Sequence, residues 1–375
     1  MRSNPTPLAA ILAEQIRSRG RITAAEYMDA CLYHPQLGYY TKADQSERRD
    51  YITSVDVTPV FGRLLARQFH EMWAVLRRPE PFALVEVGAG TGRLAKQVLG
   101  CARESLGEFY SAMRYVAVER SAVRRNAQRQ SLQDHIENER FCSSESLPAE
   151  IRFGCIFSNE LFDAFAVHRV QRISEKLREV YVRQSQNGFG EELGPLSSVA
   201  ISEYFDAQRI ALREGQMAEA NLAACRWIED AARRLDRGFV LTIDYGYEAP
   251  QLYDGHHMRG TLLAYDRHRA GEDFYRAPGA QDLTAHVNFT ALDMWGVRGG
   301  LIRAGFTSQT NFLLALARQS NFADLDNAGT SEHENIAAHS QFKTLIHPEG
   351  MGETFKVLIQ QKGIDSVQLA GLQPL

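Results

Sequence analysis

Long apolar runs, paired cysteines and basic blocks are all missing from this 375-residue sequence. No apolar run reaches the roughly 18 residues that cross a bilayer, so we expect no membrane insertion. The five cysteines are scattered and form no C-x-x-C pair, which argues against a disulfide scaffold and for a reducing compartment. With 42 Lys and Arg against 46 Asp and Glu and no basic block, nucleic acid is not an expected partner. Metal-ligand spacings such as H-E-x-x-H are absent, and we expect no metal site.

The composition is that of an ordinary folded enzyme, with 44% apolar and 23% charged residues. Near the start, Leu8, Ile11, Leu12 and Ile16 recur at helical spacing and predict an amphipathic first helix instead of a secretory signal. From Phe82 onward, short apolar segments alternate with helical patterns, which predicts a parallel sheet with crossover helices. The predicted strands are residues 82–87, 114–119, 155–158, 239–243 and 355–360.

These patterns favour an α/β fold with a Rossmann-like sheet. We divide the chain into an N-terminal helical and loop cap (1–81), a Rossmann-like core (82–168), an inserted α+β region (169–235), and the remainder of the core with a substrate-facing part (236–375). The insertion contains HRVQRI and EVYVRQ, which predict an antiparallel pair of strands. Residues 246–347 read as loop-rich.

The most informative motif is LVEVGAGTGRL at residues 84–94, where Gly88, Gly90 and Gly92 follow a strand and precede a helix. A dinucleotide site would have G-x-G-x-x-G, whereas this spacing is G-x-G-x-G. Glu86 lies two residues upstream, and Glu119 ends the next strand, where a carboxylate can accept ribose hydroxyls. Backbone donors and acids together suit an amino-acid head and a sulfonium, so we predict an S-adenosylmethionine site. The alternatives are a turn that only packs a helix, or a nicotinamide site, which would also use Glu119.

A second group of polar residues follows the strand at 155–158, at the carboxyl edge where such folds bind ligands. Asn159, Glu160 and Asp163 offer an amide and two carboxylates that can orient a cationic acceptor or take its proton. Asn159 and Asp163 can equally be helix caps. Farther on, Asp282 and His286 are candidates for a loop near Glu160, although a lone histidine is more often structural.

Seven segments in order carry a resemblance that spans nearly the whole chain: 27–42, 50–66, 84–94, 158–170, 241–247, 260–292 and 351–358. Among them are YMDACLYHPQLGYYTK, LVEVGAGTGRL and SNELFDAFAVHRV. The chain resembles the MidA-like family of S-adenosylmethionine-dependent methyltransferases, whose mitochondrial members are complex I assembly factors that act as protein arginine methyltransferases. Ala89 stands where the family usually has proline.

The resemblance implies a class I methyltransferase sheet, S-adenosylmethionine as cofactor, and a protein substrate such as a respiratory complex I subunit. It also implies that Gly38, Tyr39, Thr53 and Ser54 close over the cofactor and that Asn159 faces it, whereas without it Tyr39 reads equally well as a packing aromatic.

The motifs leave the acceptor open. Two alternatives remain. The protein is a methyltransferase for a small molecule or for another protein group, or it is a noncatalytic assembly protein that binds S-adenosylmethionine. We expect a bacterial cytoplasmic protein, or a mitochondrial matrix protein if the source is eukaryotic. The oligomeric state is open, with a homodimer as one option.

Overall fold

The fold is known from a computed structural model that describes residues 6–41, 54–186, 188–266, 269–326, 331–347 and 350–374. Two compact units share the chain, and each is assembled from three separate segments. Unit 1 comprises Met1–Tyr51, Phe162–Trp227 and Gly246–Leu292. Unit 2 comprises Ile52–Leu161, Ile228–Tyr245 and Asp293–Leu375.

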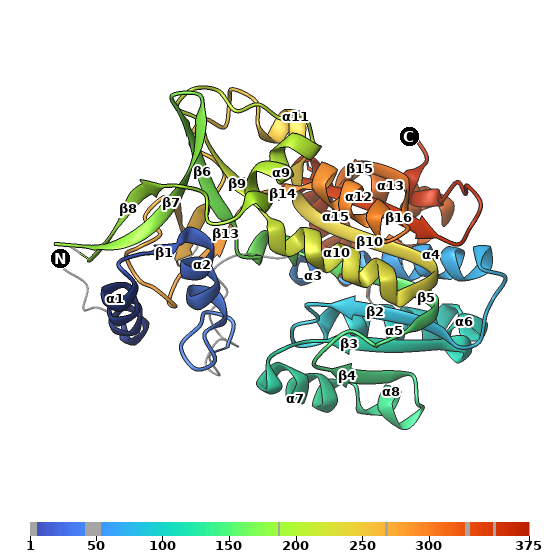
Figure 1. The fold of residues 1–375 in the computed structure, drawn as a ribbon. Helices are drawn as coiled ribbons and strands as arrows, with labels where there is room; N and C mark the ends of the chain where they lie inside the picture. The colour runs from blue at the N-terminus through green and yellow to red at the C-terminus, as the bar shows by residue number, and fades with distance from the viewer. Residues whose placement is uncertain are drawn as a thin grey trace. The chain divides into compact units, whose positions relative to one another are not determined.

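Unit 2 is built on a mainly parallel sheet in the order β15-β16-β10-β5-β2-β3-β4 (Figure 1). Its strands are β2 (Phe82–Val87), β3 (Met113–Val118), β4 (Phe141–Ser144), β5 (Ile151–Asn159), β10 (Leu235–Tyr247), β15 (Ile302–Ser308) and β16 (Phe355–Lys362). Only β16 runs antiparallel to its two neighbours, β10 and β15. Because β2 and β5 are parallel neighbours, the segments after them emerge at the same edge of the sheet.

Helices on this sheet bury a core that includes Phe61, Phe69, Phe157 and Phe312. They are α3 (Ser54–Val57), α4 (Val60–Val75), α5 (Arg93–Ser105), α6 (Gly107–Ala112), α7 (Ala122–Ser131), α8 (Gln133–Glu137), α13 (Gln309–Gln319), α14 (Ala323–Asp326), α15 (Glu332–Ile346), α16 (Met351–Thr354) and the 3-10 turn η3 (Ala370–Leu372). The bounds of α10 (Leu222–Arg234) and α12 (Phe289–Arg298) span the division between the units.

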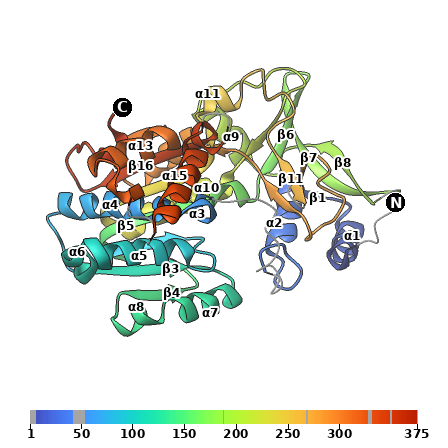
Figure 2. The same ribbon diagram turned by 180° about the vertical axis from the view of Figure 1, so that it is seen from behind.

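Unit 1 contains an antiparallel sheet, β1-β7-β6-β9, with β8 also paired to β7. Figure 2 shows β1, β6, β7 and β8 of this sheet. Its strands are β1 (Ile22–Thr23), β6 (His168–Ile173), β7 (Lys176–Ser185), β8 (Gly188–Gly194) and β9 (Met217–Ala220). A second sheet is β12-β11-β13, and β14 pairs with the end of β10. The remaining elements are α1 (Pro7–Arg19), α2 (Ala24–Tyr33), η2 (Phe162–Ala164), α9 (Val199–Ala207), α11 (Ala249–Leu252), β11 (Leu263–Asp266), β12 (Arg269–Gly271), β13 (Asp282–Thr284) and β14 (Val287–Asn288).

The five predicted strands and the antiparallel pair in the insertion are confirmed. Strand β4 was missed, because FCSS is too short and polar to stand out by hydrophobic pattern. The first helix is confirmed as α1, but Ile11 is 45% exposed and does not belong to its buried face. The loop-rich interpretation of residues 246–347 is wrong from Phe289 onward, where α12, α13 and α15 lie. Within the described part of the chain, no helix combines the length and apolarity needed to cross a membrane.

Candidate active site

The glycine-rich loop lies where the sequence predicts it, between β2 and α5. Gly88, Gly90 and Gly92 have φ of 75°, 53° and 82°, in the left-handed region that glycine adopts without a steric penalty. A side chain on Gly92 would press on Gln128 and Leu132 at 3.0 and 3.1 Å, whereas a Cβ on Gly90 would meet nothing within 4 Å. The middle of the loop therefore faces open space, into which a ligand can approach the backbone closely.

Glu119 holds this loop in shape. Its Oε2 accepts from the Gly90 amide at 3.0 Å, and its Oε1 accepts from the Ser121 amide at 2.8 Å. On the other side of the loop, the buried Gln128 donates from Nε2 to the Gly90 carbonyl at 2.8 Å. Gln128 could not be predicted from the sequence, because a glutamine inside a helix gives no signal of its own. Glu119 thus lies beside the glycine loop, and its role at a ribose stays a prediction.

Glu86 is buried beneath the loop, where the Tyr115 hydroxyl donates to its Oε2 at 2.6 Å. Burial raises the pKa of Glu86 to about 8; the Tyr115 hydrogen bond opposes this rise and the Glu119 charge adds to it. Glu86 therefore carries a proton in the folded state across the neutral range. Tyr115 was also missed, although it lies directly beside Leu84 in the neighbouring strand.

We expect Glu86→Gln to remove a pH-dependent component of stability. An unfolded glutamate ionises near pH 4.5 and the buried one near pH 8, so the protonated group's contribution is complete below pH 4.5 and is lost as the pH rises through 8. The loss is on the order of 5 kcal/mol. Thermal unfolding of both proteins between pH 5 and 9 should show that the stability of the variant increases relative to that of the parent as the pH rises. A constant difference between them would contradict a buried, protonated Glu86.

The end of β5 supplies the second part of the site. Glu160 has φ of 54°, which is strained for a residue with a side chain. Two hydrogen bonds hold this backbone: the Glu160 amide donates to the Ile243 carbonyl at 2.9 Å, and the Leu161 amide donates to Oδ2 of the fully buried Asp244 at 3.0 Å. Leu161 Cδ1 lies 3.0 Å from the position of a Cβ on Gly88, so this turn touches the glycine loop.

Hydrogen bonds from Ser54 and Asn159 help to hold the Glu160 side chain. Its Oε1 accepts from the Ser54 amide at 3.2 Å and from Asn159 Nδ2 at 3.1 Å. Asn159 Oδ1 is buried and has no hydrogen-bond partner among the described residues. Unit 2 thus brings together eight residues predicted from the sequence: Ser54, Glu86, Gly88, Gly90, Gly92, Glu119, Asn159 and Glu160. Thr53 lies outside the described residues.

The other predicted residues belong to unit 1. Tyr39 is buried in that unit's core and stacks edge-on against Tyr40. A Cβ on Gly38 would lie 2.6 Å from the His34 amide nitrogen, so glycine permits this close turn. Asp163 is buried in η2, and its carbonyl accepts from the Ala285 amide at 2.9 Å. The roles predicted for these residues stay predictions.

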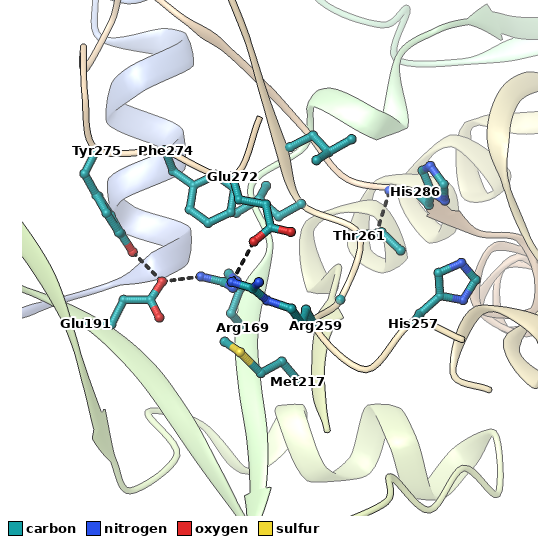
Figure 3. Close-up of a pocket in the computed structure, with 13 residues that line it drawn as sticks. Arg169, Glu191, Met217, His257, Arg259, Thr261, Glu272, Phe274, Tyr275 and His286 are labelled. Atoms are coloured by element: carbon teal, nitrogen blue, oxygen red, sulfur yellow. Dashed lines mark hydrogen bonds and ion pairs between the residues drawn. The ribbon is translucent and has the colours of Figure 1, made fainter. Parts of the chain in front are cut away.

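His286 lines a cavity of about 360 Å³ in unit 1 (Figure 3). Its backbone amide donates to Thr261 Oγ1 at 3.0 Å, and its ring lies beside those of Tyr247 and His257. Burial, with a smaller effect from His257, lowers the pKa of His286 to about 4. The imidazole is therefore neutral at pH 7 and only weakly basic; its predicted catalytic role stays a prediction.

The sequence and structure of this chain are similar to those of known proteins. These similarities agree with the glycine loop, with Glu119 and Glu160 at the strand ends, and with the order of strands in the sheet. A family model for S-adenosyl-L-methionine-dependent methyltransferases matches residues 64–307. The chain belongs to this methyltransferase family. A Burkholderia thailandensis protein crystallised with S-adenosyl-homocysteine is similar over 99% of this chain and 97% of its own, with 30% identity and a TM-score of 0.87. The sheet is accordingly a class I methyltransferase sheet.

Curated relatives of this methyltransferase carry a more specific name. The Drosophila melanogaster protein arginine methyltransferase NDUFAF7 homolog, mitochondrial, is 27% identical over 96% of this chain and 86% of its own length. The human protein arginine methyltransferase NDUFAF7, mitochondrial, is 28% identical over 94% and 83%. The resemblance to the MidA-like family is therefore confirmed.

S-adenosyl-L-methionine is the cofactor of this methyltransferase, and the residues present fit it. The open space at Gly90 admits a ligand against the backbone, and the buried Asn159 Oδ1 offers an acceptor that no described residue satisfies. The Glu119 carboxylate can accept ribose hydroxyls. Within the described residues, no group of three or more His, Cys, Asp or Glu side chains is arranged to hold a metal ion.

Proposed function

We propose that this methyltransferase transfers methyl groups to arginine side chains of a protein. The observation that carries the proposal is the geometry of Glu160. Its backbone is strained and its Oε1 accepts two hydrogen bonds, which together hold a carboxylate beside the glycine loop. Strain of this kind is retained where surrounding contacts enforce it, and it clusters at active sites. The names of the curated relatives support arginine as the acceptor.

The bound cofactor supplies a methyl group on a positively charged sulfur. The protein's first task is to counter the repulsion between that charge and a guanidinium, because two cations do not approach readily. The Glu160 carboxylate can accept N–H bonds from the planar guanidinium fork and fix its orientation. The bonds from the Ser54 amide and Asn159 Nδ2 both go to Oε1 and so orient the carboxylate.

Methylation forms a nitrogen–carbon bond and breaks the sulfur–carbon bond, and the methylated nitrogen must then lose a proton. Glu160 is placed to accept that proton and release it to water. Asp244 acts on the same turn by holding the Leu161 amide, and so keeps the Glu160 backbone in its strained conformation. Positioning of this kind supplies most of the catalysis in an in-line displacement.

Mass spectrometry of proteins from a strain that lacks this gene tests the proposal. We expect at least one arginine to lose a methyl mark that returns when the gene is restored. Loss of a methylated lysine, or of a methylated small molecule, would instead show a different acceptor. Cofactor binding without any methylated product would favour a noncatalytic assembly role.

The relatives' names place those proteins in mitochondria, and the resemblance connects the family to complex I. We propose a respiratory complex I subunit as the protein substrate, and the cytoplasm as the compartment if the source is bacterial. Methylated-peptide mapping of purified complex I, with and without the gene, tests the substrate.

A further inference from the structure

The cavity of about 360 Å³ in unit 1 has no part in the methyl transfer derived above. Its lining includes Arg169 of β6, Glu191 of β8 and Met217 of β9 (Figure 3), together with residues 259–263, 272, 274 and 275. Its volume lies at the lower end of ligand pockets and suits one long amino-acid side chain.

Charge in and behind this cavity is not balanced. Arg169 pairs with Glu191 at 2.5 Å, and Arg259 pairs with Glu272 at 2.6 Å. Behind Gly260 lies the buried Glu219, which accepts from the Thr261 amide and reaches Arg169 Nε only at 3.8 Å. With His257 and His286 counted as neutral, the two arginines and three glutamates carry a formal net charge of −1. An additional cation is therefore favoured.

Arg169 also calls for a hydrogen-bond acceptor. Its side chain is 5% exposed and lines the cavity, and its Nε has no hydrogen-bond partner among the described residues. A buried donor without an acceptor is costly. Glu219 Oε1, 3.8 Å away, also has no hydrogen-bond partner among the described residues, so a ligand that offers both a carbonyl oxygen and a cation would satisfy the two atoms.

The Arg259–Glu272 ion pair shows which kind of group the Glu272 carboxylate can bind. The two side chains are 79% and 51% exposed, so their ion pair is weak and readily exchanged. A guanidinium already lies on Glu272, and a guanidinium or ammonium from a ligand can take its place.

We propose that this cavity binds one positively charged residue, arginine or lysine, of a polypeptide. The residue's main-chain carbonyl accepts from Arg169 Nε, and its cationic side chain replaces Arg259 on Glu272. The cavity would then be a recognition site for basic protein segments. This inference rests on the proposed function only in taking a protein as the substrate.

Calorimetry on the full-length protein tests the proposal, with Nα-acetyl-arginine N-methylamide as probe and the uncharged citrulline analogue as control. We expect the arginine probe to bind and the citrulline probe to bind at least 5-fold more weakly. Glu272→Gln should weaken arginine binding at least 5-fold. Arg259→Ala should tighten it about 2- to 5-fold, because the competing internal cation is gone.

Misfolding would weaken arginine binding in both variants, so opposite effects of Glu272→Gln and Arg259→Ala cannot come from misfolding. The affinity for S-adenosyl-homocysteine should be unchanged in both variants. Equal binding of the two probes, or weaker arginine binding by Arg259→Ala, would overturn the proposal. Failure here is distinct from failure of the proposed function. If the protein methylates arginine but does not bind the probe, only the proposed recognition site is wrong. If it binds the probe but does not methylate arginine, only the assignment of arginine as the methyl acceptor is wrong.

Discussion

Glu160→Gln should lower methyl transfer by about 100- to 1,000-fold while cofactor affinity stays within about 3-fold. Glutamine keeps the side-chain shape, and its amide oxygen can still accept from the Ser54 amide and Asn159 Nδ2. It removes the negative charge that offsets the guanidinium and the site that receives the proton. The measurement is incorporation of labelled methyl groups into an extract from the deletion strain, with cofactor binding measured separately.

Glu203→Gln is a matched control, because Glu203 is an exposed glutamate on α9. Its methyl transfer should remain within about 2-fold of the parent, as expected for a change at an exposed side chain. Full activity in Glu160→Gln would exclude Glu160 from the chemistry. A loss explained entirely by weaker cofactor binding would assign it to the cofactor site alone.

Gly90→Ala should weaken S-adenosyl-L-methionine binding by about 30- to 100-fold in a protein that still folds. The added methyl group meets no protein atom within 4 Å, so it enters the space that the cofactor needs. Its left-handed backbone adds a strain of roughly 1 kcal/mol, which a stable domain can absorb. Calorimetric titration of the cofactor and thermal unfolding separate the two effects.

Two other glycines distinguish ligand clash from general damage. Gly100 lies within α5 and likewise has open space around its Cβ position, so Gly100→Ala should leave binding unchanged and stabilise the helix slightly. Gly92→Ala should chiefly lower stability, because its methyl group presses on Gln128 and Leu132. Unchanged cofactor binding in Gly90→Ala would mean that the cofactor does not approach this part of the loop.

Much of unit 2 could be predicted because its signals are local. The apolar run before Gly88 and the glycine spacing specify a strand, a turn and a helix within a dozen residues. Glu160 was found through its position after a strand, since the carboxyl ends of parallel strands share an edge. Its strained backbone could not be predicted, because the contacts that enforce it come from Ile243 and Asp244, more than 80 residues away.

Residues whose role depends on tertiary packing escaped prediction. Tyr115 and Gln128 are an ordinary strand tyrosine and an ordinary helix glutamine until folding brings them to Glu86 and Gly90. The cavity at Arg169 is similar, since its charges come from distant segments of unit 1. A single sequence carries no local pattern for such a group.

The position of β16 has a consequence for synthesis. Unit 1 is complete at Leu292, but β10 pairs along Gly238–Tyr245 with a strand that is translated more than a hundred residues later. Until β16 has been translated, the edge of β10 that pairs with it is therefore apolar and unpaired. Such an edge is a site for incorrect strand pairing or for chaperone binding. Protease digestion of ribosome-arrested chains of about 335 residues, in which Leu292 has left the exit tunnel and β16 is not yet translated, should protect unit 1 segments and cut within unit 2. Equal protection of both would contradict this order.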